Sequence, residues 1–348
     1  MKTIWYLLVK AYIKLGLFFY SKKTRVHGSE NVPKKGAVLF AVNHPNGLLD
    51  PLVVATHSPR ISHFLVRAAV FKKPLVKKFL ATLNLMPIYR IRDGRNELSK
   101  NTAVFNECFE ILKNKQALMI FPEGSHDKRR TIRPISKGFT RIVFGALEKY
   151  PTLKIQIVPV GLTYQKAGDY PSKIALHFGK PILANDYFNQ KTPLDLKQID
   201  LLKKAVRGQL KKLSVHISAD ENYEKTLQTA HKHHVDFTQV QLLNKALEKN
   251  TFTALKKEKN LLLPLYYLLA ANSILPLLVW RIIRKKIDEI EFIDTFRFAL
   301  MMTIFPIFYL LQTSLVWVFW SAEIAIYYLL ISLVLGLIYT KTAPTPAE

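Results

Sequence analysis

Two short stretches of the chain combine residue types that could carry out acid–base chemistry. In the first, the apolar run 38–42 is followed by His44, a Pro-Asn-Gly turn and Asp50. On one continuous helix His44 and Asp50 would point in different directions, but an intervening turn can bring the two side chains together. An imidazole held by a carboxylate keeps one tautomer and is an effective general base near neutral pH. We therefore predict that His44 is a catalytic base and that Asp50 aligns and stabilises it.

The same pair has a simpler explanation. Asp50 followed by Pro51 is also typical of a helix N-cap with proline at the first helical position, and a histidine after a strand is often only a buried, hydrogen-bonded residue. A second stretch favours the chemical reading. The apolar run 117–121 is followed by residues 122–127, a turn of Pro, Gly and polar side chains. Open α/β sheets place their ligands at such strand ends.

Together these stretches resemble the glycerol-phosphate and lysophosphatidate acyltransferase superfamily, whose signatures are an Asn-His…Asp block and a later Phe-Pro-Glu-Gly block. Residues 86–90 and 157–161 resemble two weaker family blocks in the expected order, so the resemblance covers roughly residues 30–185. Most members place four residues between the His and the Asp, whereas this chain has five. That spacing, with Ser-His-Asp after Phe-Pro-Glu-Gly, looks more like the fungal glycerol-3-phosphate/dihydroxyacetone-phosphate branch.

The resemblance implies transfer of a fatty acyl group from acyl-CoA or acyl-carrier-protein to glycerol 3-phosphate or its 1-acyl form, in phosphatidic acid and phospholipid synthesis. His44 would remove the hydroxyl proton for direct attack on the thioester, with no acyl-enzyme, cofactor or metal. The residues that would hold the acceptor are Asn43, Arg90, Glu123, Gly124, Ser125 and Lys137. Glu123 cannot itself bind phosphate, so we expect it to accept a hydrogen bond from a glycerol hydroxyl or to orient an arginine.

Three other functions remain open at this point. A related enzyme could remodel another lysophospholipid, which the family motifs do not exclude. A His-Asp base would also permit hydrolysis of thioesters or phosphoesters. The last alternative is a non-catalytic, basic protein that binds membranes or nucleic acid.

The overall charge and composition favour a membrane partner. The formal net charge is +26 and 49% of the residues are apolar, concentrated near the C-terminus in lengths that suit lipid. We therefore expect anionic membrane lipids, and no nucleic acid, as partners. Near the second stretch, Arg129, Arg130 and Arg133 could bind the acceptor phosphate, the phosphates of CoA or lipid head groups.

The cysteine and histidine content gives no metal site. Cys108 is the single cysteine, which excludes a disulfide framework and a thiolate metal cluster, and its helical surroundings predict a buried structural thiol. His233 and His234 diverge on a helix, so together with His231 they indicate a solvated helix rather than a set of metal ligands.

The elements that must position the site alternate between strands and helices, which predicts an α/β domain with a mixed, largely parallel sheet flanked by helices. The predicted strands are 37–42, 61–66, 85–89, 117–121, 155–160 and 174–178. The predicted helices are 51–57, 68–82, 96–114 and 137–149. We divide the chain into an N-terminal membrane-interface helix (1–29), the acyltransferase domain (30–190), a charged helical segment (191–258) and a hydrophobic membrane region (259–348).

Two helices of the N-terminal half suit a membrane surface. Residues 4–20 are apolar but carry Lys10 and Lys14 on one helical face, which favours a helix lying on an anionic leaflet over the alternative of a first transmembrane span. The predicted helix 68–82 has four lysines among apolar residues. It could simply be a core helix with a solvated face, but the net charge favours a membrane-facing one.

The C-terminal region predicts transmembrane helices. Residues 298–320 and 324–339 are uncharged stretches that read as a hairpin of spans, the alternative being a soluble helical core. Residues 261–280 contain two prolines and an asparagine, which suit a bent, re-entrant segment. The basic linker 281–297 would then be cytoplasmic by the positive-inside tendency. We thus expect a membrane protein whose catalytic domain lies on the cytoplasmic face.

Overall fold

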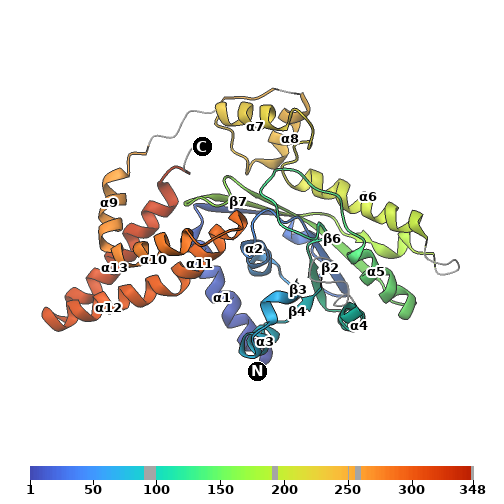
Figure 1. The fold of residues 1–348 in the computed structure, drawn as a ribbon, viewed down its shortest axis with the longest axis horizontal. Helices are drawn as coiled ribbons and strands as arrows, with labels where there is room; N and C mark the ends of the chain where they lie inside the picture. The colour runs from blue at the N-terminus through green and yellow to red at the C-terminus, as the bar shows by residue number, and fades with distance from the viewer. Residues whose placement is uncertain (90–98, 190–194, 250, 255–259, 346–348) are drawn as a thin grey trace.

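A mixed, largely parallel β-sheet forms the centre of the computed structural model, which describes residues 1–89, 99–189, 195–249, 251–254 and 260–345 (Figure 1). The strands are β1 (Lys23–His27), β2 (Ala37–Val42), β3 (Ser62–Arg67), β4 (Leu85–Ile88), β5 (Ala117–Ile120), β6 (Ile155–Tyr164), β7 (Lys173–Phe178) and β8 (Ile182–Leu183). Their order is β1-β7-β6-β2-β5-β3-β4, with β8 also paired to β6. The run from β6 to β4 is parallel, whereas β7 and β8 are antiparallel to β6. The predicted fold class is therefore confirmed.

Helices cover both faces of the sheet and continue beyond it. They are α1 (Lys2–Tyr20), α2 (Leu49–His57), α3 (Pro74–Thr82), α4 (Asn101–Lys113), α5 (Gly138–Lys149), α6 (Leu196–Leu213), α7 (Tyr223–Lys232), α8 (Val240–Lys249), α9 (Leu263–Asn272), α10 (Ile274–Arg284), α11 (Ile293–Met302), α12 (Ile304–Phe319) and α13 (Ala322–Thr342). Short 3₁₀ turns occur at η1 (Ser29–Asn31), η2 (Ala68–Phe71), η5 (Ala184–Tyr187) and η6 (Ile290–Phe292).

Strand β2 shows how the core fixes the position of the site. All of its side chains are buried, and alternate residues point to opposite faces. Leu39 and its neighbours on one face pack in the cluster that contains α4, α5 and α6, whereas Phe40 lies in the cluster formed with α1 and α2. Because both faces are filled, the strand cannot shift its register without exposing apolar side chains. The residues that follow β2 therefore leave the sheet at a fixed point.

All six predicted strands are present, and three details of the prediction were wrong. Strand β6 runs past 160 to Tyr164, because its last residues pair with β7. The predicted helix 68–82 is split into η2 and α3, since Lys73 precedes Pro74 and adopts extended backbone, as residues before proline commonly do. Strands β1 and β8 were not predicted. The start of the predicted helix 96–114 lies outside the described residues, and α4 occupies its remainder.

Helix α1 contacts the α/β domain along its length. The Trp5 indole donates to Thr82 Oγ1 at 3.0 Å, Lys10 Nζ donates to the Ser58 carbonyl at 2.7 Å, and the Tyr20 hydroxyl donates to Asp294. These contacts lay the helix against the rest of the chain (Figure 1), while several of its large apolar side chains remain exposed. The start and middle of α1 thus contact the α/β domain and its end contacts α11, while its length and composition also suit a membrane span.

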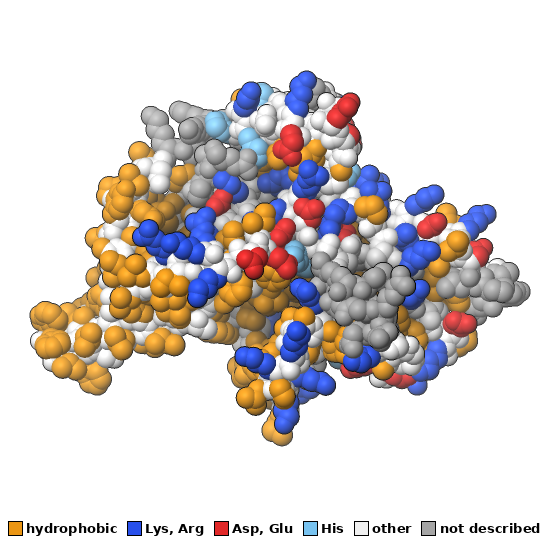
Figure 2. All heavy atoms as spheres, in the orientation of Figure 1, with side chains coloured by type: hydrophobic (Ala, Val, Ile, Leu, Met, Phe, Trp, Pro, Cys, Tyr) orange, Lys and Arg blue, Asp and Glu red, His pale blue; other side chains and the backbone are white. Residues whose placement is uncertain are grey.

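Helix α3 continues this exposed surface. None of its residues is buried, and Leu75 is 82% exposed. Its lysines surround its apolar side chains, and together they form the protrusion at the foot of the view in Figure 2. A basic helix with an exposed apolar face suits the surface of an anionic bilayer. This favours the membrane-facing reading of the predicted 68–82 helix over a core helix.

The C-terminal helices provide further membrane-compatible surface. Three helices in the described chain are long and apolar enough to cross a membrane, or four if the bent pair α9–α10 counts as one span. The other two besides α1 are Ile290–Phe319 and α13. The predicted 298–320 segment is interrupted at Thr303, where α11 ends and α12 begins. Helices α12 and α13 pack side by side and form the apolar protrusion at the left of Figure 2.

The position of the linker after α10 bears on the membrane arrangement. Residues 289–295 contact the loops that follow β2 and β5, so they lie on the same side of any membrane as the α/β domain. Helices α9 and α10 meet at 91°. A helix pair bent this sharply is a broken span or a re-entrant loop, and the return of residues 289–295 to the domain favours the re-entrant loop. Lys341 at the end of α13 donates to the Ser21 carbonyl at 2.8 Å, so α12 and α13 form a hairpin that also returns.

We predict that only the tip of the α12–α13 hairpin reaches the far side of the membrane. Single cysteines introduced at Ser321 and Asp288, in a Cys108→Ser background, would be treated in intact cells with an impermeant thiol reagent. Labelling is expected at 321 and not at 288. Labelling at 288 but not at 321 would show that α9–α10 is a complete span.

Candidate active site

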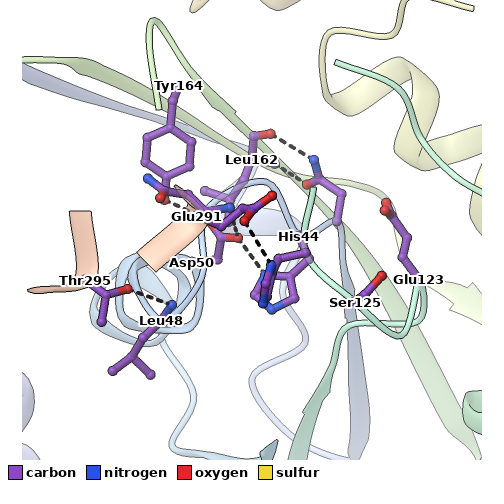
Figure 3. Close-up of polar contacts among 12 residues, drawn as sticks. His44, Leu48, Asp50, Glu123, Ser125, Leu162, Tyr164, Glu291 and Thr295 are labelled. Atoms are coloured by element: carbon purple, nitrogen blue, oxygen red, sulfur yellow. Dashed lines mark hydrogen bonds and ion pairs between the residues drawn. The ribbon is translucent and has the colours of Figure 1, made fainter. Parts of the chain in front are cut away.

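His44 and Asp50 meet at the carboxyl end of β2 (Figure 3). The His44 Nδ1 atom lies 2.7 Å from Asp50 Oδ2, and the Asp50 side chain is completely buried. Helix α2 begins at Leu49, and its N-cap Leu48 makes no side-chain capping bond. The alternative reading of Asp50 as a plain N-cap is therefore wrong, because its carboxylate turns back to the imidazole from inside the first helical turn.

Asp50 accepts two further hydrogen bonds. The Asn46 backbone N–H donates to Oδ2 at 2.7 Å, and the Tyr164 hydroxyl donates to Oδ1 at 2.8 Å. Burial, and then the Asp50 charge, raise the pKa of Tyr164 well above its usual value, so the phenol stays protonated and remains a donor. The sequence reasoning missed Tyr164, which lies beyond the end of the predicted strand 155–160.

The contact with Asp50 sets the tautomer of His44. Because a carboxylate accepts, Nδ1 carries the proton and Nε2 presents its lone pair. The ring stacks on Phe121 with a centroid separation of 4.0 Å, and His126 approaches it edge-on at 5.6 Å. The His44 side chain is 16% exposed, so a substrate hydroxyl can reach the imidazole. This geometry is compatible with proton removal by the imidazole.

Asn43 precedes His44 in the chain, and its side-chain amide is already hydrogen-bonded within the protein. Its Nδ2 donates to the Leu162 carbonyl at 3.0 Å, and its Oδ1 accepts from the Leu162 N–H at 2.6 Å. This pair of bonds ties the end of β2 to β6. The structure therefore places Asn43 as a support for His44, and leaves little of its amide to hold a substrate.

Glu123, Gly124 and Ser125 form a turn braced by Arg133. The Arg133 Nε donates to Glu123 Oε2 at 2.7 Å, its Nη1 donates to Ser125 Oγ at 2.6 Å, and its Nη2 donates to the Ser125 carbonyl. Burial raises the pKa of Glu123, and the Arg133 charge opposes that shift. Glu123 thus orients an arginine, one of its two expected roles, while Arg133 is committed to the turn. Gly124 is exposed at the tip with φ +77°, a backbone conformation that favours glycine.

Of the predicted substrate-binding residues that the structure describes, Asn43 and Glu123 line the cavity beside His44. Lys137 is exposed at the N-cap of α5 and does not line it. Arg90 lies outside the described residues. Glu123 does line it, whereas Gly124 and Ser125 form the turn beside it.

The cavity at the site has a volume of about 280 Å³. His44, Asn43, Glu123 and Tyr164 lie on one side, and α7 supplies Tyr223 and Leu227 on the other. The charged segment 191–258 therefore contributes a wall of the site, which the sequence reasoning missed.

Lys128 is one of the positively charged residues that line the cavity, and its environment differs from that of the others. It is half-buried, and burial lowers its pKa despite the carboxylates of Asp294, Glu291 and Asp169 nearby. The other cations around the cavity are engaged elsewhere. Arg130 donates to the carbonyls of Tyr164 and Gln165. The remaining two, Arg129 and Lys166, lie 3.8 Å from Glu224 and 2.9 Å from Asp169 respectively.

Metal-ligand clusters are not evident in this site. Among the residues that the structure describes, no group of three or more His, Cys, Asp or Glu side chains could hold a metal ion. The site is thus an α/β sheet edge with a carboxylate-supported imidazole beside a small cationic cavity.

Comparisons with known proteins agree with this architecture. Residues 23–163 match the family model described as Acyltransferase. Glycerol-3-phosphate O-acyltransferase 2 of Saccharomyces cerevisiae is 33% identical over 90 residues, covering 26% of this chain and 12% of the yeast protein. The 1-acyl-sn-glycerol-3-phosphate acyltransferase of Borreliella burgdorferi is 25% identical over 133 residues, covering 38% of this chain and 51% of that protein. Within this domain the chain is therefore similar to glycerol-3-phosphate and 1-acylglycerol-3-phosphate acyltransferases.

Longer matches extend beyond the domain. A probable 1-acyl-sn-glycerol-3-phosphate acyltransferase of Mycoplasma pneumoniae is 28% identical over 212 residues, covering 55% of this chain and 71% of that protein. The crystal structure of a 1-acyl-sn-glycerophosphate acyltransferase from Thermotoga maritima aligns with a TM-score of 0.43 at 17% identity, over 61% of this chain and 81% of that chain. The chain spans about an eighth of the yeast relative and half of the Borreliella one.

We predict that the His44–Asp50 pair can be separated from the stability of the fold. His44→Ala should reduce acyl transfer by about 10²–10⁴-fold, the usual contribution of a general base, while folding and membrane association persist. Asp50→Asn should destabilise the protein less than Asp50→Ala, because one amide oxygen can still accept from a buried donor. Both Asp50 variants should lose activity. Asp186→Asn, at an exposed position, is the control. Near-normal turnover by folded His44→Ala protein would exclude the general-base role.

Proposed function

We propose that this protein is a membrane-bound O-acyltransferase that transfers a fatty acyl group from acyl-CoA or acyl-carrier-protein to a glycerol phosphate. The observation that carries the proposal is the Asp50-supported His44 beside a small cationic cavity. The family match and the names of the relatives support an acceptor that is glycerol 3-phosphate or its 1-acyl form. The step belongs to phosphatidic acid and phospholipid synthesis.

In the proposed reaction His44 Nε2 removes the proton from the acceptor hydroxyl as its oxygen attacks the thioester carbonyl carbon. The new ester C–O bond forms and the C–S bond breaks, so the thiolate leaves and takes up a proton from the imidazolium. Asp50 stabilises the transient imidazolium, and Tyr164 and Asn46 keep that carboxylate in place. No nucleophilic side chain and no resident cofactor takes part in these steps.

The acceptor phosphate would lie against Lys128. A cavity of about 280 Å³ is at the small end of ligand sites and suits a polar head group. A lysine whose ammonium is partly desolvated gains most from an anion placed beside it. The acyl chain of a 1-acyl acceptor would then extend out of the cavity toward the apolar surfaces of α1 and the C-terminal helices. The catalytic domain would act at the cytoplasmic face of the membrane.

The direct test is purified protein supplied with labelled acyl-CoA or acyl-carrier-protein and a panel of acceptors. The panel contains glycerol 3-phosphate, 1-acyl-glycerol 3-phosphate, dihydroxyacetone phosphate and lysophospholipids with larger head groups. Acylated product from a glycerol phosphate is expected. Release of free fatty acid at the same rate with and without acceptor would instead identify a hydrolase.

Substitution of Lys128 tests the acceptor site. Lys128→Gln should raise the acceptor KM by about tenfold or more, because the acceptor phosphate would then lack its positively charged partner. The donor KM should change little. Lys154→Gln, at an exposed position, is the matched control. An unchanged acceptor KM with a raised donor KM would assign Lys128 to the donor instead.

A further inference from the structure

The loop that carries the catalytic turn is held from outside the family-matched domain. Residues 45–49 connect His44 to the helix that carries Asp50, and segment 289–297 lies directly over them (Figure 3). This segment is far beyond residue 163, where the family match ends. It joins the bent helix pair α9–α10 to the membrane-directed helix α11.

Asp294 is the centre of this contact. It is only 2% exposed, and each carboxylate oxygen accepts two hydrogen bonds. Oδ2 accepts from Asn46 Nδ2 at 2.8 Å and from the Gly168 N–H at 2.6 Å. Oδ1 accepts from the Tyr20 hydroxyl at 2.5 Å and from Arg297 Nη1 at 3.0 Å. One side chain thus joins α1, the turn after β2, the β6–β7 loop and α11.

Asn46 transmits this restraint to the catalytic pair. It is completely buried, and its backbone N–H donates to the same Asp50 oxygen that contacts His44. Its side-chain amide nitrogen is held by Asp294, while its Oδ1 has no hydrogen-bond partner. A buried side-chain amide whose nitrogen is hydrogen-bonded and whose oxygen is not lowers the stability of the fold. Such a cost is common at sites where the position of a residue serves function.

Neighbouring contacts fix the same turn. The Leu48 N–H donates to Thr295 Oγ1 at 3.1 Å. Gly47 has φ +43°, and a Cβ there would lie 2.7 Å from the Glu291 carbonyl oxygen, so the backbones are in close approach. Glu289 reaches His126, whose ring packs edge-on against His44, with an oxygen 3.0 Å from Nε2. The segment thus touches the turn at several points.

We propose that segment 289–297 completes the active site and that Asp294 is a positioning residue that holds the His44–Asp50 geometry through Asn46. Asp294 does not line the substrate cavity, so its positioning effect is on the rate, although its charge also lies near Lys128. The inference rests on the proposed acyl transfer for its kinetic consequence. Its structural consequence, an ordered turn 45–49, is independent of the reaction.

The kinetic test compares the wild-type protein with Asp294→Asn in detergent or nanodiscs. An asparagine keeps the size of the side chain but turns an NH₂ group toward two of the four donors. We expect kcat per folded protein to fall about tenfold or more and the donor KM to change less than about twofold. The acceptor KM should not rise, because the variant removes a negative charge near Lys128. Asp288→Asn, an exposed position six residues away, should match the wild type. Unchanged kcat in Asp294→Asn overturns the proposal.

A second measurement needs no substrate. Hydrogen–deuterium exchange of the amides in residues 45–49 should accelerate about tenfold or more in Asp294→Asn, while β2 and β5 keep wild-type protection. Equal exchange in that turn overturns the positioning role. If the wild type transfers no acyl group, the exchange result still decides the role of Asp294, and only the proposed function fails.

The variant Asn46→Ala removes the other end of the same bond and covers the case in which Asp294→Asn does not fold. Folded Asn46→Ala protein should show the same loss of kcat and the same faster exchange. In Asn46→Ala/Asp294→Asn the loss should not exceed that of the worse single variant, because both act through one link. Multiplied losses, or wild-type behaviour of Asn46→Ala, overturn the link.

Discussion

The buried carboxylate of Asp50 is the constraint on which the site depends. A carboxylate with no exposure to solvent is tolerated only when it is surrounded by donors, and here the donors are His44, the Asn46 backbone and Tyr164. His44 and Asn46 come from the turn after β2, and Tyr164 comes from the end of β6. Satisfying one charge therefore fixes the turn after β2, the first turn of α2 and the end of β6 relative to one another. The chemistry of His44 follows from that arrangement.

Much of this could be predicted from the sequence because the information is local. An apolar β-branched run that ends in Asn-His, with a Pro-Asn-Gly turn and an Asp soon after, predicts a strand end and the proximity of His44 to Asp50. Continuous apolar stretches, which suit strands buried on both faces, predicted the parallel strands. By contrast β1, Lys23–His27, is mostly polar, and becomes a strand because it pairs with β7. The division into four segments stays a prediction, since contacts such as Tyr20 with Asp294 cross its boundaries.

The rest of the site could not be predicted, since its partners are remote in the chain. Tyr164 follows Asp50 by more than a hundred residues, and Asp294 follows Asn46 by more than two hundred. No periodicity or spacing records such a pairing. The arginines show a related difficulty. In the sequence, Arg130 and Arg133 were equivalent cations beside the motif, yet one binds backbone carbonyls and the other braces the Glu123 turn. The sequence shows the charge of these two arginines, but not the groups to which they are hydrogen-bonded.

Asp294 is a charged residue at the start of α11, a membrane-directed helix. Its contacts explain how the charge is tolerated there. An isolated carboxylate there would be costly, but Arg297 and three neutral donors compensate the charge. Arg297 in turn lies over the Trp280 ring at 5.0 Å and donates to the Gly168 carbonyl. The interactions that keep this carboxylate buried therefore also dock α10 and α11 on the α/β domain. Because Asn46 is one of those donors, the same carboxylate joins the C-terminal helices to the turn that follows His44.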